Sequence, residues 1–509
     1  MAGAGLEESM DGKKSLAKPP RCWKLHVTHP TEENEKMKSI AAFTLLFFCF
    51  TVAVVQAQDL SKPDVVFIVV DDLNDWIGTM GGHPQSKTPN LDALAARGVL
   101  FTNAHCNAPQ CGPSRTSLLH GLYPKSTGKY FNNTRRPDFF GEQPMQGITS
   151  KNAPLDPIIL QRYFKQHGYR VVCGGKVAHG NTAKLKRDVD AFLNRPGDVR
   201  GNFTDDKANL WGEGGPHNHA EEETGDYKVA RWAINEWNTM SEKPLLMTVG
   251  FYRPHRPFNA PKAYFEKFPL KTIQLPQVRA NDLDDLPPYA KALARSNAHK
   301  DLFKPRTVHE QILHLGGERE WKYMVQSYLA CINYVDTQIG RLLDELQENP
   351  RKRETVIVLT SDHGWNLGEK THWCKAAIWR NTTRVPFIVV LPGDRPGGLR
   401  NNQPISHVDI YPSLCDFAGI PQPNHLEGRS ILPLLQDPSA TRDLAFLSYG
   451  PENTAAQSER YRYLRYEDGS EELYDHQKDP HEWTNLSNIP EFQTVKKKMR
   501  DQVLDFQER

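Results

Sequence analysis

Cys111 begins the stretch of this chain whose residue types and spacing could do chemistry. The sequence Cys-Gly-Pro-Ser-Arg at 111–115 indicates a turn, and Pro113 can occupy the first position of a helix that continues to His120. A helix N-terminus with Arg115 one turn further on favours an anion and activates a sulfur nucleophile. A structural cysteine before an ordinary helix would show the same residues. The rest of the chain must therefore distinguish a reactive cysteine from a structural one.

Acidic residues end two apolar runs that are typical of strands buried on both faces of a parallel sheet. The first run, residues 63–70, leads into Asp71 and Asp72, and the second leads into Asp362 with His363 beside it. Open α/β sheets place ligands at the carboxyl ends of their strands. Neighbouring buried carboxylates repel each other unless a cation neutralises them, and their oxygen atoms suit hard cations. The pattern therefore suggests Ca²⁺ or Mg²⁺.

Basic residues follow other predicted strands. Lys176 and His179, three positions apart, come after an expected strand at 169–173 and could reach one pocket. His255 lies in a proline-rich loop after a further strand, and Lys375 lies in a later loop. Taken singly, each could equally be an ordinary polar residue of a loop. Taken together, they could bind an anion beside the carboxylates.

The proline-rich loop holds His255 between Arg253 and Arg256. We expect the two arginines to lower the pKa of the imidazole, and the cluster to attract anions. These arginines, with Arg135 and Arg136, could meet further anionic groups of a ligand, such as a carboxylate. Equally, they could be surface residues.

Strand-like and helix-like segments alternate along the chain, which predicts an α/β fold with a mainly parallel sheet. Residues 270–318 show no such pattern and are expected to form an irregular insertion over one face. After about residue 435, short alternating strands predict a small antiparallel sheet with a terminal helix. The expected strands are 63–70, 99–104, 169–173, 244–251, 355–360, 386–391, 444–449, 461–466 and 472–474, and the expected helices are 88–98, 158–167, 226–240, 320–347, one opening at 407, and 490–507.

Charge and cysteine content exclude some classes of protein. The 509 residues carry a formal net charge of +2, so no nucleic-acid partner is implied. Two of the eight cysteines lie in an N-terminal part that we expect to be removed. A catalytic Cys111 would leave an odd number for pairing, which argues against a full disulfide framework. No pair has the spacing of zinc ligands.

An apolar stretch near the N-terminus predicts export to a secreted or periplasmic location. Residues 37–57 have the parts of a secretory signal peptide, and we expect 1–36 to be a non-native or unstructured extension. An uncleaved membrane anchor is the alternative, but about 16 apolar residues are short for a span, so no stable span is expected after cleavage. The rest divides into a catalytic domain, 60–435, and an α+β subdomain, 436–509.

The groups gathered at the predicted strand ends suit the transfer of a tetrahedral anion. A divalent cation and cationic side chains would bind the oxyanion and stabilise charge in the transition state. A nucleophile would attack the central atom, and an acid would protonate the leaving alcohol. The residues therefore predict an enzyme that acts on esters of such an anion.

The motifs resemble those of the type I sulfatases over about residues 62–490. The Pro-His-x-Pro-Phe loop and Gly-Glu-x-x-x-Trp-x-Lys make the chain most similar to the iduronate-2-sulfatase branch. His120 departs from the signature, which usually has threonine there. The elements that match the family in type and order are Asp71-Asp72, Cys111-x-Pro-Ser-Arg115 with Gly121, Gly175-Lys176-x-x-His179, Asp362-His363-Gly364 and Lys375.

That resemblance implies an alkaline-phosphatase-like α/β fold, with a large, mixed, mainly parallel sheet flanked by helices and a smaller C-terminal antiparallel-sheet subdomain. It implies a sulfuric ester hydrolase that removes sulfate from a sulfated carbohydrate, as an iduronate-2-sulfatase-like exosulfatase. In that family a formylglycine-generating enzyme oxidises the motif cysteine, here Cys111, to Cα-formylglycine. One hydroxyl of the hydrated form attacks sulfur to give a sulfate-ester intermediate, and the other expels sulfate.

The resemblance also implies the metal site and its partners. Asp71, Asp72, Asp362, His363 and the modified Cys111 would hold Ca²⁺, with Mg²⁺ possible. The expected partners are a sulfated saccharide as substrate and the formylglycine-generating enzyme during maturation.

Catalytic roles carry over in the same way. Arg115 and Lys176 would steady the formylglycine, and Lys176 would also contact sulfate. His179 would take the proton that drives sulfate release. His255 and Lys375 would contact the sulfate and the leaving oxygen, one of them as the acid. We favour His255, because an unperturbed imidazole titrates near the working range.

Two other functions fit parts of this pattern. A phosphate or phosphonate ester hydrolase of the same superfamily would have a similar metal site. An inactive, exported protein that binds sulfated glycans would keep the fold, but the intact cysteine motif and the acidic and basic groups argue against it.

Overall fold

The computed structural model describes residues 62–132, 158–180, 182–199, 214–296, 306–393 and 396–508. All of them belong to a compact unit that spans Gln58–Arg509. The expected extension and signal peptide, 1–57, lie outside the described residues, as do Arg135 and Arg136. In the described part, no helix combines the length and the hydropathy that crossing a membrane requires.

An eight-stranded sheet forms the centre of this unit, in the order β13-β2-β12-β9-β1-β7-β4-β5. Neighbouring strands run parallel except at β12, which pairs antiparallel with both β9 and β2. The expected large, mixed, mainly parallel sheet is therefore confirmed. Its strands are β1 (Asp64–Asp71), β2 (Val99–Phe101), β4 (Arg170–Gly175), β5 (Ala191–Leu193), β7 (Leu245–Pro254), β9 (Thr355–Ser361), β12 (Phe387–Val390) and β13 (Leu399–Asn401).

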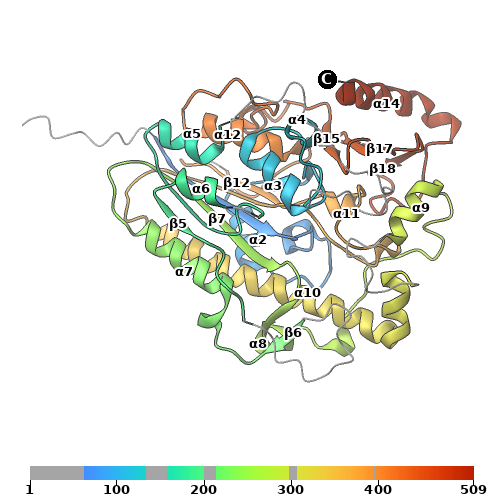
Figure 1. Cartoon of the computed structure of the whole chain (residues 1–509), viewed down its shortest axis with the longest axis horizontal. Helices are drawn as coiled ribbons and strands as arrows, with labels where there is room; N and C mark the ends of the chain where they lie inside the picture. Colours follow the sequence, from blue (N-terminus) through green and yellow to red (C-terminus); the bar gives the residue numbers. More distant parts are fainter. Residues whose placement is uncertain are drawn as a thin grey trace, which may run out of the picture. The chain divides into compact units, whose positions relative to one another are not determined.

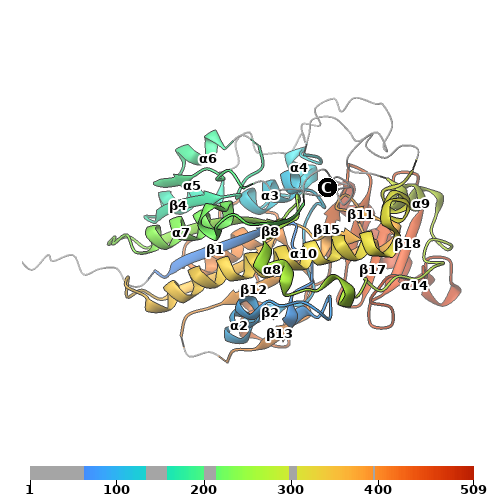
Figure 2. The same ribbon diagram turned by 90° about the horizontal axis from the view of Figure 1, so that it is seen from below.

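Strand β1 lies between β7 and β9, and all of its residues are buried. Because side chains alternate along a strand, its apolar residues supply two cores. Val66 and Ile68 pack with α2 (Pro89–Arg97), α7 (Gly225–Trp237) and α10 (Val308–Glu348), whereas Val65 and Phe67 pack with α3 (Cys111–His120), α5 (Leu160–Gln166) and α12 (Ile410–Phe417). Figures 1 and 2 show α7 and α10 on one face of the sheet and α3 and α5 on the other. An uninterrupted apolar strand is what two covered faces require.

Helix α10 begins earlier than its apolar pattern predicts. The hydroxyl of Thr307 accepts a hydrogen bond from the Glu310 N–H (3.1 Å), and the Glu310 carboxylate accepts one from the Thr307 N–H (2.8 Å). This reciprocal cap satisfies donors that a helix start leaves free. Gly317, with φ 59°, then breaks the helix before its long buried part.

The expected irregular insertion at 270–318 is therefore wrong in part. It contains α9 (Pro288–Arg295) as well as the first turns of α10. The prolines and glycines of this segment look like helix breakers in the sequence. Pro288, however, occupies the first turn of α9, where its missing N–H costs no hydrogen bond.

The expected strand at 99–104 is also divided. After β2 the chain leaves the large sheet, and β3 (Ala104–His105) pairs with β14 (Ile405–Ser406). Two further two-stranded sheets join β6 (Gly215–His217) to β8 (Asn259–Pro261) and β10 (Asn366–Leu367) to β11 (Trp373–Cys374). The short helices are Gly78–Met80, α4 (Pro124–Thr127), α6 (Ala183–Arg187), Glu221–Glu223, α8 (Lys262–Glu266), Leu270–Thr272, Glu369–Thr371, α11 (Arg380–Thr383), His407–Asp409, α13 (Leu432–Gln436) and Pro490–Phe492.

A C-terminal antiparallel sheet is present as predicted. It runs β15-β16-β17-β18, through Ala445–Ser448, Thr454–Gln457, Tyr461–Arg465 and Glu471–Asp475, and α14 (Gln493–Glu508) packs on one side of it. Its other side holds the loop that follows β11. The Arg462 guanidinium donates to the Ile378 carbonyl (2.6 Å), and the Trp379 indole N–H donates to Glu472 (3.0 Å).

Gly250 in β7 shows how tightly the strand ends pack. A Cβ there would lie 2.2 Å from the backbone carbonyl carbon of Lys176, so an alanine must push the end of β4 away. We expect Gly250→Ala to lower the free energy of unfolding by about 1–3 kcal/mol, measured by urea denaturation. Gly197→Ala is the matched control, because a Cβ there meets no described atom within 4 Å. Equal losses in the two variants would contradict this packing.

Candidate functional site

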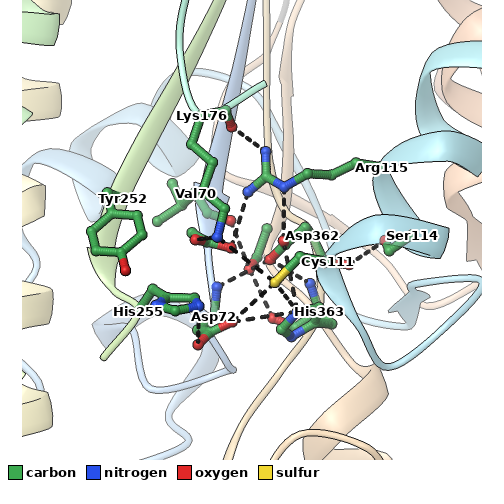
Figure 3. A network of polar contacts seen from close by, with 12 residues as sticks. Val70, Asp72, Cys111, Ser114, Arg115, Lys176, Tyr252, His255, Asp362 and His363 are labelled. Atoms are coloured by element: carbon green, nitrogen blue, oxygen red, sulfur yellow. Dashed lines mark hydrogen bonds and ion pairs between the residues drawn. The ribbon is translucent and has the colours of Figure 1, made fainter. Parts of the chain in front are cut away.

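The carboxyl ends of β1 and β9 bring acidic residues together, and Figure 3 shows two of them, Asp72 and Asp362. Asp71 ends β1, and Asp72 follows it with a positive φ of 62°. The Asp72 N–H donates to a carboxylate oxygen of Asp362 (3.0 Å), and the Asp362 N–H donates to the Val70 carbonyl (3.0 Å). All three carboxylates are fully buried. The two buried strands thus place the acidic residues where the sequence predicts them.

Arg115 joins two of these carboxylates to helix α3. Its guanidinium lies 3.1 Å from Asp71 and 2.9 Å from Asp362, and it also donates to the Val177 carbonyl (3.3 Å). Its side chain is 1% exposed. This arginine therefore fixes α3 against the ends of β1, β4 and β9.

Helix α3 begins at Cys111, two residues before the expected start at Pro113. Gln110 precedes it in an extended conformation, and its carbonyl accepts the Ser114 N–H (3.0 Å). The first N–H groups of a helix have no partner within the helix, so a proline in that turn costs no hydrogen bond. Asn132 satisfies another of them, since its side-chain oxygen accepts the Gly112 N–H (2.6 Å).

The Cys111 sulfur lies among positive groups. Lys375 Nζ is 3.0 Å from Sγ, His363 Nε2 is 3.3 Å away, and Lys176 Nζ is 3.7 Å away. Complete burial alone would raise the pKa of the thiol, but the charges of Lys176, Lys375 and His363 outweigh burial and hold it well below its ordinary value. The position of Sγ is therefore one where negative charge is stabilised.

Both lysines also neutralise carboxylates. Lys176 Nζ is in close contact with Asp71, and Lys375 Nζ lies 2.7 Å from Asp72. Burial would lower the pKa of each ammonium, but the aspartates and Cys111 raise it above the ordinary value. Both side chains therefore stay charged in this water-poor site.

His255 lies at the edge of the cluster. Its Nδ1–H donates to the Arg256 carbonyl (2.5 Å), so that Nε2 faces Asp72 at 3.8 Å. Burial, with Lys176 and Lys375, lowers the pKa of the ring although Asp72 opposes this. The expected direction is confirmed, but the expected cause is wrong. The guanidinium of Arg253 forms an ion pair with Asp198 and donates to the backbone carbonyl of His255 (2.7 Å). The order of residues along the chain does not reveal which group each side chain faces.

His179 differs from the other expected site residues because it is exposed. Its side chain still forms a hydrogen bond that contributes to the lowered pKa of Cys111. It therefore lies where the cluster around Cys111 meets solvent.

The acidic residues fit a divalent cation. Asp72 Oδ2 is buried without a hydrogen-bond partner among the described residues. Burial and the charge of Asp71 raise the pKa of Asp362, so a third negative charge is disfavoured here unless more positive charge is supplied. His363 donates from Nδ1 to the Gly364 carbonyl (3.0 Å), and this leaves Nε2 facing the cluster. Carboxylate oxygens with one imidazole nitrogen could bind Ca²⁺ or Mg²⁺.

In the part of the chain that the structure describes, two overlapping groups have ligand atoms that all lie within 4.8 Å of one another. One comprises Asp71, Asp72, Cys111 and His255, and the other Asp71, Cys111, Asp362 and His363. The second group lies within the ligand set expected from the sequence, and His255 is the added member of the first.

Several residues that position the site were not found from the sequence. The Tyr328 hydroxyl donates to the Asp72 carbonyl (2.6 Å) and accepts the Asn74 N–H (3.1 Å), which holds the turn after β1. The Ser114 hydroxyl contacts His407 Nδ1 (3.0 Å) behind Asp362. A tyrosine inside an apolar helix such as α10 has the pattern of a core residue, so the sequence around Tyr328 does not indicate that it positions the site.

Comparisons with known proteins identify the family. A family model described as "Sulfatase" matches residues 63–420, and one described as "N-sulphoglucosamine sulphohydrolase, C-terminal" matches 368–509. This chain belongs to the sulfatase family. It is therefore a hydrolase of sulfuric esters, and the resemblance stated from its motifs is confirmed.

Relatives agree with this assignment, and solved structures share the fold. A "Sulfatase" from Formosa agariphila is 36% identical over 86% of this chain and 85% of its own length, and the mouse iduronate 2-sulfatase is 29% identical over 75% and 74%. The solved structure titled "Structure of BT1596, a 2-O GAG sulfatase" has a TM-score of 0.66 at 22% identity, covering 87% of this chain and 92% of its own. A phosphonate monoester hydrolase from Silicibacter pomeroyi has a TM-score of 0.70 at 20% identity, covering 88% and 96%. These two likenesses concern the fold.

Cation binding should be measurable without an activity assay. Because a cation that binds only the folded state stabilises it, free Ca²⁺ at about 100 times its Kd should add about 2.7 kcal/mol to the free energy of unfolding. We expect Asp72→Asn to lose most of this gain, measured by denaturation with and without the ion. Asp443→Asn, at an exposed carboxylate, is the control. The same gain in wild type and in Asp72→Asn would rule out this cation site.

Proposed function

We propose that this protein removes sulfate from a sulfated carbohydrate as an iduronate-2-sulfatase-like exosulfatase. The observation that carries the proposal is the surroundings of Cys111 Sγ, with Lys375 at 3.0 Å, His363 at 3.3 Å and Lys176 at 3.7 Å. A sulfate attacked from this position would have cationic donors beside its oxygens. Such preorganised donors stabilise charge that develops in the transition state.

The nucleophile in this proposal is Cα-formylglycine, made from Cys111 by a formylglycine-generating enzyme. Its hydrated form supplies one hydroxyl to attack sulfur and a second to expel sulfate afterwards. The buried helix start fixes this residue, since the Asn132 side chain caps the adjacent N–H and Arg115 fixes the helix to two strand ends. Fixed reacting groups lower the entropic part of the barrier.

The other residues hold the anion and move protons. Lys176 and Lys375 would bind the sulfate oxygens, and Arg115 would position the carboxylates it contacts. His255 would protonate the leaving sugar oxygen, while the exposed His179 would take the proton that accompanies sulfate release. A Ca²⁺ ion, with Mg²⁺ as the alternative, would be held by Asp71, Asp72, Asp362, His363 and the modified Cys111 and would supply further positive charge.

Cys111→Ala tests the nucleophile. Because alanine cannot provide a hydroxyl, we expect sulfate release to fall at least about 1000-fold, to the background that binding groups alone give. The cavity is small, so the variant should fold. Released sulfate and thermal unfolding measure the two effects.

Mass spectrometry of the peptide that contains position 111 is the companion measurement. We expect an aldehyde in active wild-type enzyme and an intact thiol in enzyme produced without the modifying partner, which should be weakly active. A fully active enzyme with an unmodified thiol would disprove the formylglycine step.

His255 and Lys375 can be distinguished by leaving group. General acid catalysis contributes about 10²–10⁴-fold when the leaving alcohol is poor and little when it leaves unaided. We expect His255→Gln to reduce kcat on a sugar sulfate by about this factor, but to reduce it far less on 4-nitrophenyl sulfate. Lys375→Met should reduce both, because it removes an anion-binding charge. The reverse pattern would make Lys375 the acid.

The carbohydrate substrate and the location are parts of the same proposal. The similar proteins include one named iduronate 2-sulfatase and a structure titled as a glycosaminoglycan sulfatase. We place the enzyme outside the cytoplasm, secreted or periplasmic, because residues 37–57 have the pattern of a signal peptide.

Phosphate and phosphonate esters remain the competing substrates, since they too present a tetrahedral anion and a hydrolase of this class shares the fold. The ratio of kcat/KM for 4-nitrophenyl sulfate to that for phenyl phosphonate esters decides between them. A ratio above one supports the sulfatase proposal, and a ratio below one supports the alternative.

A further inference from the structure

Arg195 lies on the face of Tyr252, an aromatic ring next to the site. Its guanidinium carbon is 3.4 Å from the centre of the tyrosine ring. The same ring lies 4.7 Å from the imidazole of His255, measured between ring centres, and 5.1 Å from Lys176 Nζ. Figure 3 shows Tyr252 next to His255 at the edge of the cluster. Tyr252 thus contacts Arg195 as well as two groups of the site, His255 and Lys176.

The loop that carries Arg195 is firmly held. After β5 it reaches Asp198, whose carboxylate forms an ion pair with the buried Arg253 and accepts the N–H of Gly225 (3.1 Å) at the start of α7. The Asn259 side chain donates to the Val199 carbonyl (2.8 Å). Arg253, which the sequence suggested as an anion-binding residue, therefore anchors this loop instead.

Exposure indicates where the sugar must lie. The side chain of Asp72 is fully buried, those of Lys375 and Lys176 are 6% and 8% exposed, and that of His255 is 19% exposed. Of these side chains His255 is the most exposed, and His179 is exposed as well, so the sugar lies on the side where the two histidines reach solvent. Arg195 is exposed too, and it contacts the same Tyr252 ring as His255. No described residue forms an ion pair with its guanidinium.

We infer that Arg195, stacked on Tyr252, binds a second anionic group of the substrate, next to the sulfate that is removed. This inference rests on the proposed sulfatase function and narrows its substrate class to sugars with at least two negative charges. Carboxylate and sulfate share the chemistry that a planar guanidinium recognises, through paired N–H donors. Stacking on the ring orients the guanidinium in advance, which lowers the cost of binding.

Three probes separate the sources of the second charge. They are a uronate 2-sulfate monosaccharide, glucosamine 2-N,6-O-disulfate, and N-acetylglucosamine 6-sulfate, which has no second anion. A charge-assisted pair in a binding site corresponds to about a 10- to 100-fold effect. We expect Arg195→Ala to lower kcat/KM on both kinds of probe unequally. The loss on the preferred doubly charged probe should exceed the loss on the singly charged probe by that factor, and it should arise from a higher KM.

Variants make the result specific. Arg195→Lys should recover part of the loss, because it keeps the charge but not the planar stack. Tyr252→Leu should produce a similar selective loss. Arg97→Ala, an exposed arginine in α2, is the control and should not alter the preference among probes.

Each outcome decides the inference. A larger loss on the uronate identifies a carboxylate subsite, and a larger loss on the disulfate identifies a sulfate subsite. Equal losses on all three probes, or a wild-type enzyme that prefers the singly charged probe, would overturn it while leaving sulfate-ester hydrolysis intact. If the wild-type enzyme released sulfate neither from the three probes nor from 4-nitrophenyl sulfate, the proposed function itself would fail.

Discussion

Repulsion among three carboxylates buried at the ends of β1 and β9 is the constraint on which this structure depends. Two unit charges about 4 Å apart interact by roughly 4 kcal/mol at an effective dielectric constant of about 20, so these charges must be compensated. Arg115, Lys176 and Lys375 supply part of this compensation from three separate segments. The same ion pairs therefore stabilise the fold and create a region where an incoming anion meets positive charge.

The C-terminal sheet contributes to this compensation of charge by holding the loop that carries Lys375. The loop after β11 carries Lys375, and the residues that follow it are held by Arg462 and Glu472 of β17 and β18. The N–H of Arg380 also donates to Glu482 (2.9 Å). One cation of the site thus depends on contacts made by the last part of the chain. The two family models overlap at 368–420, which includes this loop.

Much of the site could be predicted because its residues stand at the ends of strands. A continuous apolar run defines a buried strand, and the residue after it has a defined place at the edge of the sheet. Asp71, Asp72 and Asp362 were found in this way. Their charges also explain why lysines from other strand ends, such as Lys176, meet them.

Side-chain direction is what the sequence could not supply. Arg253 and His255 are two positions apart, yet the arginine turns to Asp198 while the histidine faces Asp72. Tyr252 resembles any aromatic residue at the end of a buried strand, and its contact with Arg195 joins segments that are far apart in the sequence. The early start of α10 depends on a cap formed by polar residues, which an apolar period does not reveal.

The burial of Cys111 has a consequence for the order of events as the protein is made. A separate enzyme cannot reach a fully buried sulfur in the first turn of a helix, so the proposed oxidation must come before folding is complete. Lys375, which covers the sulfur, lies 264 residues later in the chain. At roughly 5–20 residues per second, synthesis of that length takes on the order of ten seconds to a minute. The spacing of the site along the chain thus leaves the thiol accessible for a limited time, after which the arriving C-terminal half closes it.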